Sequence, residues 1–329
     1  MKSISELRQD IVSGDWVVIA TGRAKRTNDL ITEEHVTFAQ TKKTCPFEKR
    51  FADARIVYTK NTATKGSDWW VQAIPNKYPA FDKGICAVFN NVGPYLVTNG
   101  AGAHEVVITA DHHRSFALIT DAELVIHMYQ DRFRILQDDR CVQYVSLFHN
   151  HGKLAGASIS HPHSQIIAIP VVPPDVASSL EGSERYYKEK KECVHCVMLR
   201  YDLQEKKRLI CESEYFAVVA PFASRTAFEI RIFPKKHQAR FEDIAPDEQR
   251  DFAHIFRAAL VKLYHGLENP DYNFFLHTAP AKNSHSYEHY HWHFEILPKT
   301  AIWAGFEIGT GIEISTIRPD DAAAFLRYI

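Results

Sequence analysis

The pattern of apolar and polar positions predicts a chain of many short strands and two long helices. Apolar runs rich in β-branched and aromatic residues, bounded by glycine, proline or polar clusters, are typical of strands. Apolar side chains instead recur with a helical period from Val125 to Leu136 and from Phe252 to Leu263, and Thr120 and Glu123 have the spacing of a capping box. The predicted strands occupy 16–20, 69–75, 104–108, 142–148, 158–170, 216–220, 228–233, 273–277 and 288–298.

The order of these elements is repeated along the chain. In each part a cysteine motif is followed by a strand, a histidine, a helix, a strand and a further strand with a His-x-His pattern. An internal repeat of about 150 residues is expected to be two copies of one α+β unit rather than a solenoid. We therefore predict the α+β class, with tandem repeats over residues 1–175 and 190–329, each an antiparallel sheet with a packed helix.

Three polar side chains, His161, His163 and Gln165, alternate at the start of one predicted strand. Alternate residues of a strand face the same side of a sheet, so the three are expected to lie together. Neutral imidazole is a nucleophile toward phosphorus, which makes His163 the candidate nucleophile, and Gln165 is placed to donate to a phosphoryl oxygen. The glycine-bearing loop at 150–158 is expected to bring backbone N–H groups close to a phosphate. The alternative is a sheet whose histidines only hydrogen-bond each other.

Two sets of sulfur, nitrogen and carboxylate ligands predict one or two zinc ions per chain. The second half offers a complete Cys2His2 set, a pattern typical of tetrahedral structural zinc, in Cys193, Cys196, His237 and His289. By the repeat, the first half offers Cys45, Glu48, His112 and His161. His113 competes with His112 for one of these roles, and the alternative for the first half is an empty site with Glu48 as a surface residue.

Composition narrows the classes of partner. The 329 residues include 39 Lys+Arg and 40 Asp+Glu, giving a formal net charge of −1, so any phosphate site must be local and no nucleic-acid partner is expected. The first seven residues lack the apolar core of a signal peptide, and no membrane-spanning run is found. The six cysteines are not typical of a disulfide framework, so we expect a cytoplasmic protein in which Cys86, Cys141 and Cys211 are buried thiols.

At His161-Pro162-His163-Ser164-Gln165 the chain resembles the galactose-1-phosphate uridylyltransferase family of the histidine-triad superfamily. The resemblance covers nearly the whole length and includes 22–26, Asn76, the 150–158 loop, 234–237 and 305–311. It implies two histidine-triad-like halves that form a half-barrel-like sheet. It also implies a homodimer whose subunits share each active site.

The resemblance implies ping-pong transfer of UMP between a UDP-hexose and a hexose 1-phosphate, as in galactose metabolism. In this mechanism His163 attacks the α-phosphorus and forms a covalent nucleotidyl-histidine. The implied hexose-binding residues are Phe306 and Glu307. The implied nucleotide-binding residues are Arg23, Arg26, Asn76, Asn150, Gly156, Ser158 and Gln165.

Several alternatives stay open at this stage. Segments 164–174 and 305–311 also resemble a relative that acts on ADP-glucose with phosphate, so adenine competes with uracil. A nucleotide hydrolase using His291 within His289-x-His291-x-His293 has the histidine-triad spacing, and a zinc-stabilised binding protein is the non-catalytic reading. In some family members the positions of His277 and His291 bind a second metal, which competes with the zinc set built on His289.

Overall fold

A ten-stranded antiparallel sheet runs through the whole molecule. The structure is a computed structural model and describes residues 5–23, 40–59, 69–82, 84, 86, 88–112, 115–282 and 284–329. The central pair is β8 (Tyr144–His151) with β13 (Tyr272–His277). Outward from β8 follow β9 (His163–Ile169), β7 (Ala103–Thr109), β4 (Val71–Pro75) and β3 (Ile56–Tyr58). Outward from β13 follow β14 (His293–Pro298), β12 (Ile230–Pro234), β11 (Phe216–Val219) and β10 (Leu209–Glu212). The α+β class and the antiparallel sheet are confirmed.

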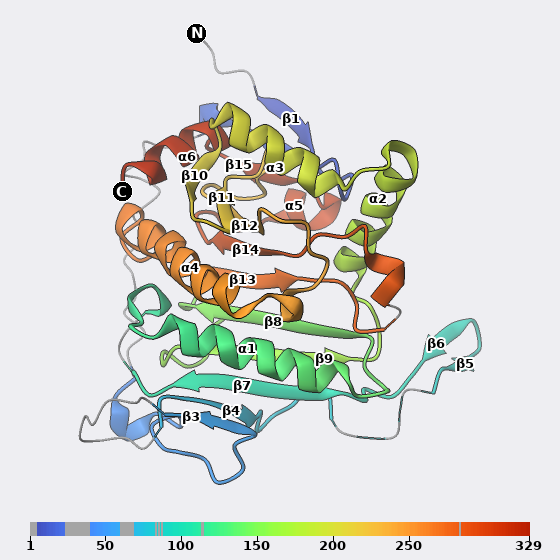
Figure 1. Cartoon of the computed structure of the whole chain (residues 1–329), viewed down its shortest axis with the longest axis vertical. Coiled ribbons are helices and arrows are strands. Elements are labelled where there is room, and N and C mark those ends of the chain that lie inside the picture. Colours follow the sequence, from blue (N-terminus) through green and yellow to red (C-terminus); the bar gives the residue numbers. More distant parts are fainter. Residues whose placement is uncertain are drawn as a thin grey trace.

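Two long helices cover one face of this sheet, as the helical periods predicted. They are α1 (Ala122–Gln137) and α4 (Pro246–Gly266), which lie side by side across the strands in Figure 1. Their apolar faces and the sheet form the main core, which also includes α6 (Pro319–Arg327). The expected capping box is not made, because α1 begins after Asp121, whose side chain makes no capping hydrogen bond.

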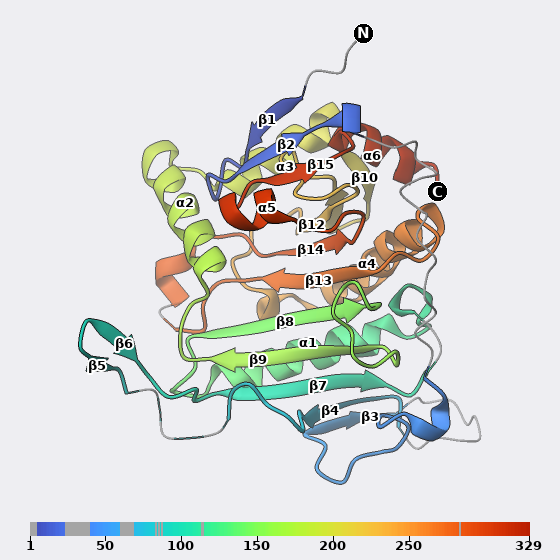
Figure 2. The ribbon, with the colours of Figure 1, turned by 180° about the vertical axis from the view of Figure 1, so that it is seen from behind.

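The opposite face of the second half is covered by the strand predicted at 16–20 and by several segments for which the sequence predicted no helix or strand. These include α2 (Pro174–Lys190), α3 (Val194–Glu205), α5 (Gly305–Thr310) and a small sheet of β1 (Glu6–Gln9), β2 (Trp16–Ile19) and β15 (Glu313–Ser315). Leu199 of α3 packs on Ala217 and Val219, whose neighbours Phe216 and Val218 face the main core. Figure 2 shows β1, β2, β15 and α5 over this half, whereas β7, β8 and β9 face the viewer.

A hairpin of β5 (Asn90–Val92) and β6 (Tyr95–Val97) projects from the body (Figures 1 and 2). Near its base a disulfide joins Cys86 to Cys141, which follows α1. The expectation of buried free thiols is therefore wrong for these two residues, because the fold brings together cysteines 55 positions apart. Cys211 is a free, half-buried thiol. Among the described helices none is long and apolar enough to cross a membrane.

A buried ion network joins the small sheet to the large one. The guanidinium of Arg231 lies 3.1 Å from the carboxylate of Asp10 and 3.0 Å from that of Glu295, with Glu229 at 3.4 Å. Arg225 also pairs with Glu295. Buried charges are stable only when they are paired, so this network depends on both arginines.

We expect Arg231→Met to lower the free energy of unfolding by about 3–5 kcal/mol, since it strands buried carboxylates. Urea unfolding followed by circular dichroism measures this as a lower midpoint. Arg250→Met is the matched control, because Arg250 forms an exposed pair with Asp247 that contributes little. Equal midpoints for the two variants would contradict the prediction.

Candidate active site

Strand β9 divides its side chains between the two faces of the sheet. Ser164 contacts Tyr129 of α1, and Ile166 and Ala168 belong to the main core. Because successive side chains of a strand point to opposite faces, His163 and Gln165 lie on the face of the sheet away from the helices. That face of β9 is turned to the viewer in Figure 2. The predicted grouping of these polar residues on one face agrees with this arrangement.

His163 presents a neutral nitrogen to the open face. Its Nδ1 lies 2.8 Å from the carbonyl oxygen of His161, which can only accept, so Nδ1 carries the proton and Nε2 keeps its lone pair. Burial lowers the pKa of His163, which keeps the ring uncharged near neutral pH. No described residue hydrogen-bonds Nε2. The ring therefore meets the requirements of a nucleophile.

Gln165 and Asn76 meet at a third residue, His104. Gln165 Oε1 lies 2.8 Å from His104 Nε2, and Asn76 Nδ2 lies 3.1 Å from the same nitrogen. Asn76 follows β4 and His104 belongs to β7, next to β9 in the sheet. The structure thus places Gln165 and Asn76 side by side on the face that carries His163.

The loop between β8 and β9 is fastened by an aspartate from the second half. The carboxylate of Asp271 accepts a hydrogen bond from the backbone N of Leu154 at 2.6 Å. Gly152 has φ +80°, and a Cβ there would lie 1.9 Å from Asp271 Oδ1, so only glycine allows this approach. Gly156 also has a left-handed backbone conformation, with φ +85°. Gly156 and Ser158 are both exposed on this loop. The backbone of the predicted phosphate loop is therefore held in one conformation.

Asn150, at the end of β8, is oriented by Asn273 of β13. Asn273 Nδ2 donates to Asn150 Oδ1 at 2.8 Å and to the carbonyl of Ala155 at 2.9 Å. Since the Asn150 oxygen is occupied, its amide N–H groups remain for a ligand. The second half thus positions a residue that belongs to the first.

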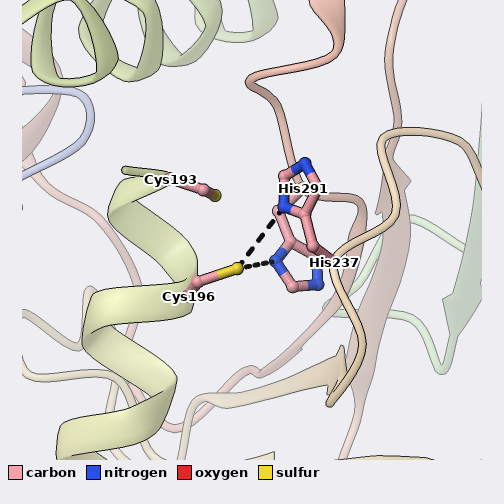
Figure 3. Close-up of side chains that lie close together, drawn as sticks. All are labelled: Cys193, Cys196, His237 and His291. Carbon is pink, nitrogen blue, oxygen red and sulfur yellow. Dashed lines mark hydrogen bonds between the residues drawn. The ribbon is translucent and has the colours of Figure 1, made fainter. Parts of the chain in front are cut away.

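A Cys2His2 cluster lies where α3 begins (Figure 3). Cys196 Sγ lies 3.4 Å from Nδ1 of His237 and 3.4 Å from Nδ1 of His291, and Cys193 completes the set. Hydrogen bonds from Cys196 and from the neighbouring histidines lower the pKa of the Cys193 thiol, so a thiolate forms readily.

The fourth member is His291, and the prediction of His289 is wrong. His289 precedes β14 and lines a small cavity of about 320 Å³ beside α2. Its ring approaches Tyr187 and Tyr287, at centroid distances of 6.3 and 6.4 Å, rather than the cysteines. Spacing alone allowed either histidine, since both would share a face of the strand predicted over 288–298, whereas in the structure His289 lies in a turn and β14 begins at His293.

The first half holds the four residues predicted for it. Cys45, Glu48, His112 and His161 form a group, with Cys45 Sγ 3.4 Å from His161 Nδ1 and Glu48 against His112 Nδ1. His113, the competing candidate, lies outside the described residues. Glu48 thus occupies the position of the missing thiolate.

Both clusters fit zinc by the same test. Each histidine turns its Nδ1 into the cluster and places its Nε2 close to a backbone carbonyl oxygen. In the first cluster, Nε2 of His161 lies 2.7 Å from the carbonyl of Thr109, and Nε2 of His112 lies 2.7 Å from that of Gln40. In the second, Nε2 of His237 lies 2.7 Å from the carbonyl of Glu288, and Nε2 of His291 lies 3.0 Å from that of Pro234. Such carbonyl partners fix the tautomer of metal-binding histidines. Sulfur and nitrogen at neighbouring corners of a zinc tetrahedron lie roughly 3.5 Å apart, close to the three 3.4 Å separations.

A third group, His277, His293 and Glu295, fits a metal less well. Glu295 already pairs with Arg225 and Arg231, and two adjacent guanidiniums oppose a divalent cation. The alternative second metal position at His277 therefore receives no support from its surroundings.

Within one chain, three predicted residues that the structure describes do not join His163, namely Arg23, Phe306 and Glu307. Arg23 is exposed at the end of a 3-10 turn, and Arg26 lies outside the described residues. Phe306 is exposed and Glu307 is half-buried on α5, where Glu307 accepts from the backbone N of Ala304 at 3.0 Å. Among the described residues, none of these side chains bonds to the His163 strand.

A family model described as the N-terminal domain of galactose-1-phosphate uridyl transferase matches residues 1–173, just over half of the chain. The chain belongs to the galactose-1-phosphate uridylyltransferase family. A second model, described only as a domain of unknown function, matches residues 96–326. The predicted resemblance is thereby confirmed.

Relatives of the chain are named for two different activities. An ADP-glucose phosphorylase of Arabidopsis thaliana is 32% identical over 98% of this chain and 93% of its own. A galactose-1-phosphate uridylyltransferase of Thermotoga maritima is 28% identical over 98% of each. The crystal structure of an Arabidopsis ADP-glucose phosphorylase with bound ADP-glucose matches 99% of both chains, with a TM-score of 0.81 and 30% identity.

Sequence reasoning missed the residues that support this family's site from outside the motif. His104, Asp271 and Asn273 each hold a predicted residue or the loop in place. Asn273 and His104 stood at the starts of predicted strands, where a polar residue carries no distinguishing pattern. Only the pairing of β13 with β8 and of β7 with β9 makes them part of the site.

We expect purified protein to hold about two zinc ions per chain, as measured by inductively coupled plasma mass spectrometry. His291→Ala should lose one of them, because it removes a ligand from the second cluster. His289→Ala is the matched control and should keep both. The reverse pattern, with zinc lost only from His289→Ala, would restore the original assignment.

Proposed function

We propose that the chain is an ADP-glucose phosphorylase, a nucleotidyltransferase that moves AMP from ADP-glucose to inorganic phosphate through a covalent adduct on His163. The observation that carries the chemistry is the tautomer of His163, whose Nδ1–H is held by His161 while Nε2 stays available. The choice of adenine is supported by the relative that is 32% identical and by the matched structure with ADP-glucose.

The first half-reaction forms a nitrogen–phosphorus bond. His163 Nε2 attacks the α-phosphorus, and the bond from that phosphorus to the bridging oxygen breaks, releasing glucose 1-phosphate as an anion. Gln165, Asn150 and the loop N–H groups donate to the phosphoryl oxygens as charge develops. No general acid is required, since a phosphate leaves readily without a proton.

The second half-reaction reverses the first with another phosphate. An oxygen of inorganic phosphate attacks the α-phosphorus, the nitrogen–phosphorus bond breaks, and ADP leaves with His163 again neutral. Zinc at the first cluster would be held by Cys45, Glu48, His112 and His161, and its chemistry is to keep the His161 backbone rigid beside the nucleophile.

The adduct is the decisive measurement. Wild type incubated briefly with ADP-glucose and no acceptor should gain the mass of one AMP, and His163→Asn should gain nothing, because the nucleophile is absent. His265→Asn, on an exposed histidine at the end of α4, is the control. Adding phosphate should discharge the adduct as ADP. An undiminished adduct on His163→Asn would overturn the assignment.

Uridylyl transfer between UDP-hexose and hexose 1-phosphate is the second candidate. It is supported by the Thermotoga relative and the family model, both named for that activity. A UMP-sized gain from UDP-glucose would select it. The hydrolase reading is weaker, because His291 is fully buried in the Cys2His2 cluster, and a binding protein would form no adduct.

We also propose that the halves at 1–175 and 190–329 are repeats of one histidine-triad-like unit. The same strand order on either side of the central pair supports this, as does the shared His-x-His geometry. In both halves Nδ1 of the second histidine approaches the carbonyl of the first, at 2.8 Å for His163 and 3.1 Å for His293. The half-barrel-like form of the combined sheet belongs to the same proposal.

A homodimer with shared sites is the assembly we propose. Phe306 is exposed and Glu307 is half-buried on α5, which follows β14, and β13 and β8 lie between β14 and the His163 strand. A second copy bringing its α5 to this strand would supply the hexose-binding residues that one chain leaves apart.

Mixing two inactive variants tests the shared site. Refolding His163→Asn together with Glu307→Ala should restore part of the wild-type turnover, because one of the two sites in a mixed dimer then has both residues intact. Each variant refolded alone is the control. No recovery above those controls, in a mixture shown by mass to contain mixed dimers, would contradict a shared site.

A further inference from the structure

The ring of His104 contacts two side chains of the proposed nucleotide site. Its Nε2 lies 2.8 Å from Gln165 Oε1 and 3.1 Å from Asn76 Nδ2. Its Nδ1 lies 3.1 Å from the backbone N of Ala80. The ring is half-buried, and all of these contacts lie beside the strand that carries His163.

These contacts determine where the proton of His104 lies. The backbone N–H of Ala80 can only donate, so Nδ1 accepts and the proton of the neutral ring is on Nε2. Of the two neighbours of Nε2, only the carbonyl oxygen of Gln165 can accept that proton. Asn76 Nδ2 is itself a donor, because Asn76 Oδ1 accepts from Tyr78 N at 2.9 Å, so its 3.1 Å approach to the protonated Nε2 is a contact and not a hydrogen bond.

The proton of His104 in turn decides which way the Gln165 amide faces. The oxygen and nitrogen of a glutamine amide have nearly the same shape, so hydrogen bonding alone selects the orientation. With Oε1 held by His104, the NH2 group is turned to the open face. The flipped amide would set two donors against each other and present a carbonyl oxygen to a phosphoryl oxygen, which is repulsive.

We infer that His104 is a positioning residue that orients Gln165 so that its N–H groups, and not its carbonyl, meet the phosphoryl group attacked by His163. The inference rests on the proposed function, since it needs the nucleotidyl-transfer step. Gln165 is two residues beyond His163, roughly 6.6 Å along the strand, so its amide is within reach of an α-phosphoryl oxygen. Both ring nitrogens of His104 are occupied, so it acts through Gln165 and not on substrate.

The test measures the single-turnover rate of adduct formation from ADP-glucose without acceptor, by rapid quench and intact mass. His104→Phe should slow this rate by about 10- to 100-fold. This loss is no larger than the loss of rate that follows removal of one hydrogen-bond donor from an oxyanion hole. The half-saturating ADP-glucose concentration should change little, because the lost contact belongs to the transition state. His104→Gln keeps an acceptor for Ala80 and a donor for Gln165, and should recover most of the rate.

A double-mutant cycle separates positioning from a structural role. If His104 acts through Gln165, then His104→Phe combined with Gln165→Ala should be no slower than Gln165→Ala alone. Losses that multiply would overturn the inference. His265→Phe is the matched control for a histidine replaced on the surface, and unchanged melting and zinc content verify the fold.

The outcomes distinguish this inference from the proposed function. Wild type that forms no adduct with ADP-glucose or UDP-glucose would refute both. An adduct that forms on wild type and equally fast on His104→Phe would refute the inference alone. If His104→Phe does not fold, His104→Leu takes its place with the same expected loss, and an undiminished rate there would equally refute the inference.

Discussion

Side-chain alternation along β9 is the constraint on which the site depends. One set of side chains on β9 faces the helices, namely Ser164, Ile166 and Ala168. Of these, Ser164 hydrogen-bonds Tyr129 of α1. A slip of one residue against β7 or β8 would turn this apolar set outward and bury His163 and Gln165 in its place. The packing of α1 on the sheet therefore also fixes the direction of His163, the candidate nucleophile.

The motif and the two helices could be predicted because each depends on local pattern. The strand of His163, the helical periods of α1 and α4, and the ligand set of the first half follow from alternation, period and spacing. The choice between His289 and His291 could not be predicted in this way. The two residues are two positions apart, so strand alternation treats them alike, and only the approach of Cys196 to His291 distinguishes them. The Cys86–Cys141 bridge joins distant segments and has no local signal.

The helices that were missed are held by tertiary contacts more than by their own pattern. Helix α2 is highly charged, and its buried positions include few apolar side chains, among them Val176 and Leu180. Gly182 lies so close to the backbone of Val12 that a Cβ there would be 1.7 Å from the Val12 carbonyl oxygen. A glycine in the middle of a charged segment lowers helix propensity, so the sequence alone predicted no helix there.

The two halves share a strand order but differ in what covers their open faces. In the second half Arg231 and Glu295 take part in an ion network beneath the small sheet, and His293 lies against Phe233 at a ring distance of 5.0 Å. The first half leaves β7, β8 and β9 without such a cover among the described helices in Figure 2. Access to substrate, more than the His-x-His pattern itself, therefore separates the candidate active half from its counterpart.

In the proposed function, oriented neutral donors close to His163 bind the diphosphate of the substrate. The net charge of −1 provides no general attraction, and the described contacts around His163 come from amides and backbone N–H groups rather than from cations. An amide helps an anion only when its oxygen is turned away, and here Asn273 holds the oxygen of Asn150 while His104 holds that of Gln165. Donors fixed before substrate arrives do not have to reorganise as charge develops, which is the condition under which neutral groups stabilise a phosphoryl transition state. The supporting residues on β7 and β13 thus determine the sign of the field that the motif presents.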